Sequence, residues 1–197
     1  EGEIHSRSKG STPREMGKDD SKYPYDRIFA AADLATMHGA DQLPEVKKLL
    51  KDSDSAVRYW GAVGILNRGV AAIKASEKEL LAALQDDSFY VRIAAGYAFG
   101  KYGAQPQQRK GIDTLVAVAP WKKGSDVFVS MAALNAIDKL DSKAGYALET
   151  IRGFPTSGGG SPDGRYNKYI ARILSKTVQD LGSGKQSSEK KKKRKKK

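Results

Sequence analysis

Two pairs of aspartate and arginine at a fixed spacing are the most evident candidates for chemistry in this sequence. Asp52 precedes Arg58 and Asp86 precedes Arg92, by six residues in each case. Carboxylates supply general acid and base groups in many enzymes. A carboxylate at the turn before a helix also caps that helix and pairs with a nearby arginine. We interpret Asp52, Arg58, Asp86 and Arg92 as a structural ladder, not as catalytic residues.

Other residues that carry out catalysis or bind metals are scarce. Cysteine is absent, which excludes disulfides, thiolate metal sites and cysteine nucleophiles. The two histidines, His5 and His38, are far apart, and no G-x-S-x-G motif occurs. The triple glycine at 158–160 and the GSGK stretch at 182–185 both lack the Lys-Ser or Lys-Thr of a phosphate-binding loop. We therefore expect no catalytic residue and no metal site in this chain.

Positive charge is concentrated at the carboxy terminus. Residues 185–197 hold nine basic side chains and one acidic side chain, which is most of the net charge of +12. Such a run attracts sulfate or phosphate polymers and also resembles a nuclear localisation signal, but it equally fits a tail that only aids solubility. A loop with Trp121 supplies a second candidate, because an open aromatic ring beside lysines can stack on a base or a sugar. The candidate polyanion contacts are Trp121, Lys122, Lys123, Lys190, Lys191, Lys192, Lys193, Arg194, Lys195, Lys196 and Lys197.

Apolar residues recur with the period of an α-helix from residue 23 to residue 182. Tyr25, Ile28, Phe29 and Ala32 begin the pattern, and no segment shows the alternation of a strand. No apolar run is long enough to span a membrane. Residues 1–22 are polar and show no period, which predicts a disordered strap, and residues 183–197 predict a disordered polybasic tail. The glycine-rich segment 153–165 predicts a loop, followed by a last helix that caps the fold.

An internal repeat predicts how these helices are arranged. Residues 49–69 align with residues 83–103 at an offset of 34, and weaker copies occupy residues 26–39 and 129–141, where Ser130 replaces the arginine. Repeats of 30 to 40 residues, each made of two helices, are typical of an α-solenoid. The Asp and Arg positions resemble those of the HEAT repeat across about residues 25–141. We predict an all-α fold: a HEAT-like α-solenoid of two-helix repeats.

Continuous segments of the amino-acid sequence also resemble a group of bacterial sulfatases. The similarity lies in EGEIHSRSKGSTPREMGKDDSKYPYDRIFAAADLAT, LLKDSDSAVRYWGAVGILNRG and VRIAAGYAFGKYG, and it covers residues 1 to about 181. It matches the region that follows the alkaline-phosphatase-like catalytic domain of these enzymes. We therefore interpret the chain, which begins at Glu1 without methionine, as a piece of a longer protein.

This resemblance implies a secreted or periplasmic hydrolase of sulfate esters or sulfamates. Such an enzyme uses calcium and a formylglycine that is made in the pattern C/S-x-P-x-R. The nearest match here ends in Glu15 instead of arginine, so no catalytic residue carries over. The calcium ligands and the formylglycine belong to the preceding catalytic domain. The resemblance implies that this domain is the partner of the present chain and that sulfated polysaccharide is a candidate ligand.

Three functions are consistent with the sequence. The chain is an accessory region of a sulfatase, a free-standing HEAT-like scaffold that binds a protein, or a HEAT-like protein that binds nucleic acid. Acidic side chains are well mixed with basic ones in residues 23–182, which disfavours the last of these. We expect the accessory region.

Overall fold

The structure is a computed structural model that describes residues 11–122, 126–159, 164 and 166–183. Every regular element in these residues is helical, as the periodicity predicts. The elements are α2 (Pro13–Met16), α3 (Tyr25–Met37), η1 (Ala40–Gln42), α4 (Leu43–Leu49), α5 (Ser55–Asn67), α6 (Gly69–Ala75), α7 (Glu77–Ala83), α8 (Phe89–Tyr102), α9 (Gln107–Val118), α10 (Val127–Asp138), η2 (Asp141–Ala147), α11 (Leu148–Arg152) and α12 (Asn167–Gly182). None of these helices is both long and apolar enough to cross a membrane.

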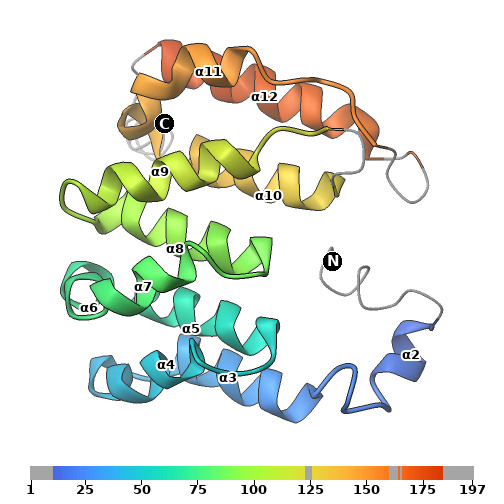
Figure 1. Cartoon of the computed structure of the whole chain (residues 1–197), viewed down its shortest axis with the longest axis vertical. Coiled ribbons are helices and arrows are strands. Elements are labelled where there is room, and N and C mark those ends of the chain that lie inside the picture. The colour runs from blue at the N-terminus through green and yellow to red at the C-terminus, as the bar shows by residue number, and fades with distance from the viewer. Residues whose placement is uncertain (1–10, 123–125, 160–163, 165, 184–197) are drawn as a thin grey trace, which may run out of the picture.

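The helices lie in two rows along the long axis of the molecule (Figure 1). One row runs α3, α5, α8, α10 and α12, and each helix packs against the next. The second row holds α4, then α6 and α7, then α9, then η2 and α11, and each contacts the adjacent helices of the first row. The two segments matched by the internal repeat contain α5 and α8, which are neighbours in the first row.

The central helix α8 is apolar on nearly all sides, because neighbours enclose it. Val91, Ala95 and Ala98 join the apolar cluster that α5, α6 and α7 share, whereas Ile93 joins the cluster formed with α9, α10 and α12. A helix that is hydrophobic all round has no preferred face for solvent and is buried. Helix α8 therefore links the two halves of the core.

One expectation about local structure is wrong. The strap was predicted without regular structure, but residues 13–16 form α2, in which the Thr12 and Glu15 side chains bond reciprocally to each other's amides. Met16 on this short helix is 2% exposed. Farther along the chain, α6 begins at Gly69, which has a positive φ of 76°. The expected disorder of residues 1–10 and 184–197 lies outside the described residues.

Helices α8 and α9 approach closely because glycine lies at their contact. A methyl group on Gly111 would lie 2.6 Å from the carbonyl oxygen of Gly96 and 2.7 Å from Cβ of Phe99. The first of these is a backbone atom, which moves only if the whole helix moves. Gly111 is thus a position where the packing permits no side chain.

We expect Gly111→Ala to lower the free energy of unfolding by about 1–3 kcal/mol, because overpacking outweighs the roughly 1 kcal/mol by which alanine favours a helix. Urea denaturation followed by circular dichroism measures this change. Gly145→Ala is the control, since no atom lies within 4 Å of the added methyl group. Equal stability of the two variants would contradict the close contact.

Candidate functional site

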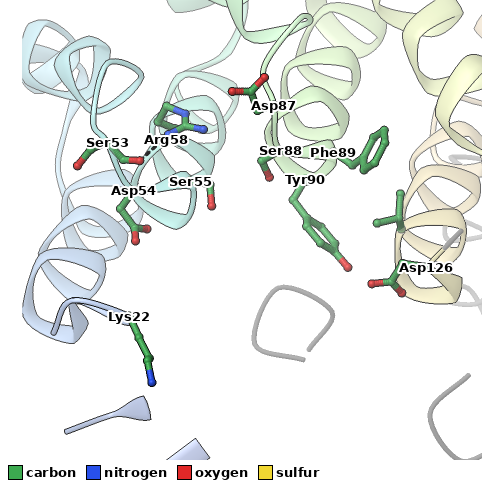
Figure 2. A pocket seen from close by; sticks show the side chains of 11 residues that line it. Lys22, Ser53, Asp54, Ser55, Arg58, Asp87, Ser88, Phe89, Tyr90 and Asp126 are labelled. Carbon is green, nitrogen blue, oxygen red and sulfur yellow. Dashed lines mark hydrogen bonds between the residues drawn. The ribbon is translucent and has the colours of Figure 1, made fainter. Parts of the chain in front are cut away.

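A groove of about 580 Å³ opens where α5, α8 and α10 begin. Figure 2 shows that its lining comes from the turns before these helices, with Lys22 reaching in from the segment before α3. The lining residues are Lys22, Ser53, Asp54, Ser55, Arg58, Asp87, Ser88, Phe89, Tyr90, Asp126 and Val129. The groove is thus built from corresponding positions of successive helices of one row.

Most charged groups of the groove also stabilise the helices around it. Asp54 caps α5 by accepting hydrogen bonds from the amides of Ala56 at 2.8 Å and Val57 at 3.3 Å. Asp126 caps α10 by accepting one from the amide of Phe128 at 2.7 Å. A carboxylate in this position satisfies amides that otherwise lack partners and interacts favourably with the helix dipole. The groove therefore presents capped helix starts and two aromatic rings.

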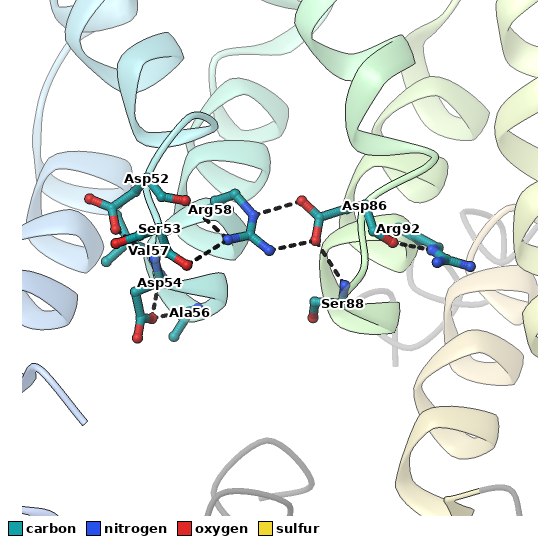
Figure 3. Close-up of polar contacts among 9 residues, drawn as sticks. All are labelled: Asp52, Ser53, Asp54, Ala56, Val57, Arg58, Asp86, Ser88 and Arg92. Carbon is teal, nitrogen blue, oxygen red and sulfur yellow. Dashed lines mark hydrogen bonds and ion pairs between the residues drawn. The ribbon is translucent and has the colours of Figure 1, made fainter. Parts of the chain in front are cut away.

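Arg58 links α5 to the turn before α8, as Figure 3 shows. Its Nε and Nη2 donate to the two carboxylate oxygens of Asp86 at 2.7 and 2.8 Å. Its Nη1 donates to the carbonyl oxygens of Asp52 and Ser53, both at 3.0 Å. The side chains of Arg58 and Asp86 are only 16% and 11% exposed. A bidentate pair in this setting is strong and directional.

A similar pair precedes it in the stack. Arg27 of α3 binds the carboxylate of Asp52, in the turn before α5. Asp52 and Asp86 also accept a hydrogen bond from the amide two residues ahead, Asp54 and Ser88 respectively, each at 2.8 Å. Each aspartate thus shapes its own turn and binds the arginine of the preceding helix in the row. The weaker copy of the repeat at residues 26–39 aligns Arg27 with Arg58, but sequence alone does not identify Asp52 as the partner of Arg27.

Of the two arginines in the predicted ladder, the structure places one in an ion pair with an aspartate. Arg58 forms the expected ion pair with an aspartate at a repeat turn. Arg92 does not, because its Nε donates to the backbone carbonyl of Asp86 and its guanidinium lies over the ring of Phe89. At the next copy of the repeat Ser130 replaces the arginine, and its buried hydroxyl has no hydrogen-bond partner among the described residues. The carboxylate ladder ends at Asp86.

The expectation that Trp121 is open to solvent is wrong. Its side chain is 2% exposed and belongs to the core cluster around α10 and α12. The glycine-rich segment covers it, because a Cβ on Gly158 would lie 2.6 Å from the carbonyl oxygen of Trp121. The amide N–H of Gly159 also donates to the carbonyl oxygen of Lys122 at 3.3 Å. Trp121 therefore provides no stacking surface, although Lys122 beside it is exposed. Lys123 and the tail from Lys190 to Lys197 lie outside the described residues.

Three groove residues, Lys22, Phe89 and Tyr90, were not among the candidates that the sequence indicated. Lys22 falls in the predicted strap, and only the offset of 34 shows that residues 89 and 90 follow a turn like that before α5. Within the described ranges no group of three or more His, Asp or Glu side chains lies together as a metal site would require.

No protein-family model matches the chain, and a search of curated proteins finds no match either. The resemblance to sulfatases rests on the residues quoted above.

We expect Arg58→Ala to lower the free energy of unfolding by up to about 3 kcal/mol, because it leaves the Asp86 carboxylate partly buried without its cation. Arg92→Ala should cost about 1 kcal/mol or less, since it removes one bond to a carbonyl. Urea unfolding of both variants tests the difference. If Arg92→Ala lowered the free energy of unfolding as much as Arg58→Ala, the assignment of the ion pair with Asp86 to Arg58 would be contradicted.

The same pair predicts a dependence of stability on pH. Burial alone would raise the pKa of Asp86, but the hydrogen bonds from Arg58 and from the Ser88 amide outweigh it and hold that pKa below its ordinary value. A lowered pKa in the folded state stabilises the fold above the pKa of the unfolded state, about 3.9, and this contribution is lost as pH falls through the folded pKa.

We therefore expect wild type to exceed Asp86→Asn in stability at neutral pH and this difference to shrink below about pH 4. Chemical denaturation between about pH 7 and pH 2 measures it. Asp87→Asn changes the neighbouring exposed carboxylate and serves as the control. A difference from Asp86→Asn that stays constant over this range would show that the Asp86 charge is not what stabilises the turn.

Proposed function

We propose that the chain is a HEAT-like α-solenoid that serves as the non-catalytic accessory region of a sulfatase. The observation that carries this proposal is the bidentate pair of Arg58 and Asp86, which couples consecutive helices of one row at the positions matched by the 34-residue repeat. Stacked helical units joined in this way present an extended surface for a partner. The resemblance of the running sequence to the region after a sulfatase catalytic domain indicates which partner.

The groove is the surface we assign to this partner. Its lining combines charged and hydroxyl side chains with the rings of Phe89 and Tyr90, which supply apolar area. Its backbone is held by the caps and by the Arg58 pair, so a partner meets a surface that is already ordered. Pre-organisation of this kind lowers the entropic cost of binding. We propose that the catalytic domain of the same polypeptide packs here and that calcium and formylglycine reside in that domain.

The location follows from the same proposal. Sulfatases of the resembling group are secreted or periplasmic, so we propose that this protein is too. The absence of cysteine fits either compartment and does not discriminate between them.

A free-standing scaffold is the second candidate, and α3 favours it. This helix begins the first row, and its outer side exposes Tyr25, Phe29 and Met37, with the rings of Tyr25 and Phe29 stacked at 6.1 Å. Exposed apolar side chains grouped on one helix are typical of protein contacts. This face would suit a partner from another polypeptide as well as a preceding domain.

The reading frame upstream of Glu1 discriminates between the two candidates. We expect it to encode an alkaline-phosphatase-like domain with a C/S-x-P-x-R pattern. The complete protein should release sulfate from an aryl sulfate or a sulfated glycan, whereas the 197-residue chain should release none under the same conditions with calcium.

Two results would contradict the accessory assignment. One is an upstream sequence without the pattern, which would favour the scaffold. The other is sulfate release by the 197-residue chain itself. Arg58→Ala in the complete protein supplies a matched control, since it should reduce thermal stability without removing any group of the catalytic domain.

A further inference from the structure

The two ends of the first row of helices differ in the side chains that they expose (Figure 1). Helix α12 closes one end, and apart from Tyr169 every exposed side chain on it is polar. Helix α3 forms the other end, where Phe29 is 61% exposed and Met37 is 78% exposed. A polar outer face is what the terminal unit of a helical stack needs in order to remain soluble alone. The α3 end therefore presents the apolar surface that a further element would cover.

The internal repeat shows in which direction the exposed ring of Phe29 points. Arg27 aligns with Arg58, an offset of 31 residues, so Phe29 aligns with Trp60. Trp60 packs against the apolar cluster that includes Ile28 of α3, the preceding helix of the row. The same position on α3 therefore faces the place that a helix before α3 would occupy.

Two carboxylates lie on the same face of α3. Asp26 aligns with Val57, which is 2% exposed, and Asp33 aligns with Gly64. A Cβ on Gly64 would lie 3.2 Å from Cα of Ala35, so α5 packs closely on α3 at this point. Both aspartates are exposed. A charge at such a position is costly to cover unless the covering element supplies a charge of opposite sign.

The negative charge of this face is largely not compensated by the fold. Arg27 is the only lysine or arginine of α3, and it binds Asp52 in the turn before α5. Asp33 contacts Nε2 of His38 at 2.9 Å, but both side chains are about half exposed, and exposed pairs are weak. The outer face of α3 thus combines apolar side chains with carboxylates.

We propose that the outer face of α3, made of Tyr25, Asp26, Phe29, Asp33 and Met37, docks a basic amphipathic helix of another polypeptide. Apolar side chains of that helix cover the exposed ring and thioether. Two lysines or arginines seven residues apart pair with the two aspartates, which have the same spacing. The inference rests on the second candidate function, the scaffold, and names the chemistry of its partner.

Other occupants fit this face less well. Lys22, just before α3, lines the groove, so the chain that precedes α3 leads to the groove. The exposed side of α12 is mostly polar, so a second copy stacked end to end would bring little apolar surface. An anionic membrane would repel Asp26 and Asp33. A separate helix that carries both apolar and basic side chains matches both features of the face.

The probe is a helical peptide of about 18 residues, with leucines on one face flanked by two arginines seven residues apart. A second peptide has glutamates in place of the arginines. The full 197-residue chain is compared with Phe29→Ala, on α3, and Phe89→Ala, in the groove, where the ring is 47% exposed. Both rings are largely exposed, so circular dichroism should show that both variants fold.

We expect Phe29→Ala to bind the arginine peptide about tenfold more weakly than wild type, because an exposed ring at the centre of a contact contributes much of the affinity. Phe89→Ala should bind it as wild type does. Wild type should prefer the arginine peptide to the glutamate peptide by about tenfold at low salt, and Asp26→Asn with Asp33→Asn should remove this preference. Titration calorimetry measures all of these affinities.

Several results would overturn the proposal. These are no binding of the arginine peptide to wild type, equal affinity for the two peptides, and an equal loss from Phe29→Ala and Phe89→Ala, which would place the peptide elsewhere. Self-association of wild type in sedimentation velocity that Phe29→Ala abolishes would assign the face to a second copy instead. A sulfatase motif upstream of Glu1 would leave these measurements unchanged, so this proposal and the accessory assignment fail separately.

Discussion

The pairing of Arg58 with Asp86 is the interaction on which the arrangement of the stack depends. One guanidinium binds both oxygens of a carboxylate in the next turn of the row and two carbonyl oxygens of its own turn. Such a fork has little freedom, because each bond restricts the direction of the others. It therefore fixes where α8 begins relative to α5, and with it the two walls of the groove.

The second half of the molecule is held by apolar packing instead. The ladder ends at Asp86, and Ser130 stands where the next arginine would be. Trp121 and the leucine and isoleucine side chains of α9, α10 and α12 form one continuous core there. Gly158 allows the loop backbone to lie against Trp121, since a larger residue would collide with it. Polar pairs thus fix how the first helices of the row lie relative to one another. Apolar packing fixes the positions of the last ones.

The charged side chains that line the groove are largely committed to the fold. Asp54 and Asp126 are occupied as helix caps, and Arg58 is paired with Asp86. The surface that we propose for a partner therefore offers a fixed shape and a few remaining polar groups.

The sequence by itself determined that the fold is helical, and it predicted a structural role for Asp52, Arg58 and Asp86. These depend on periodicity and on spacing within a turn, which are local properties. Only the tertiary structure decided that Arg92 binds a carbonyl, because its partner depends on what the next unit offers. It also decided that Trp121 is buried, since the covering segment lies more than 30 residues away in the chain. Contacts between distant segments depend on how helices stack, and no local pattern contains that information.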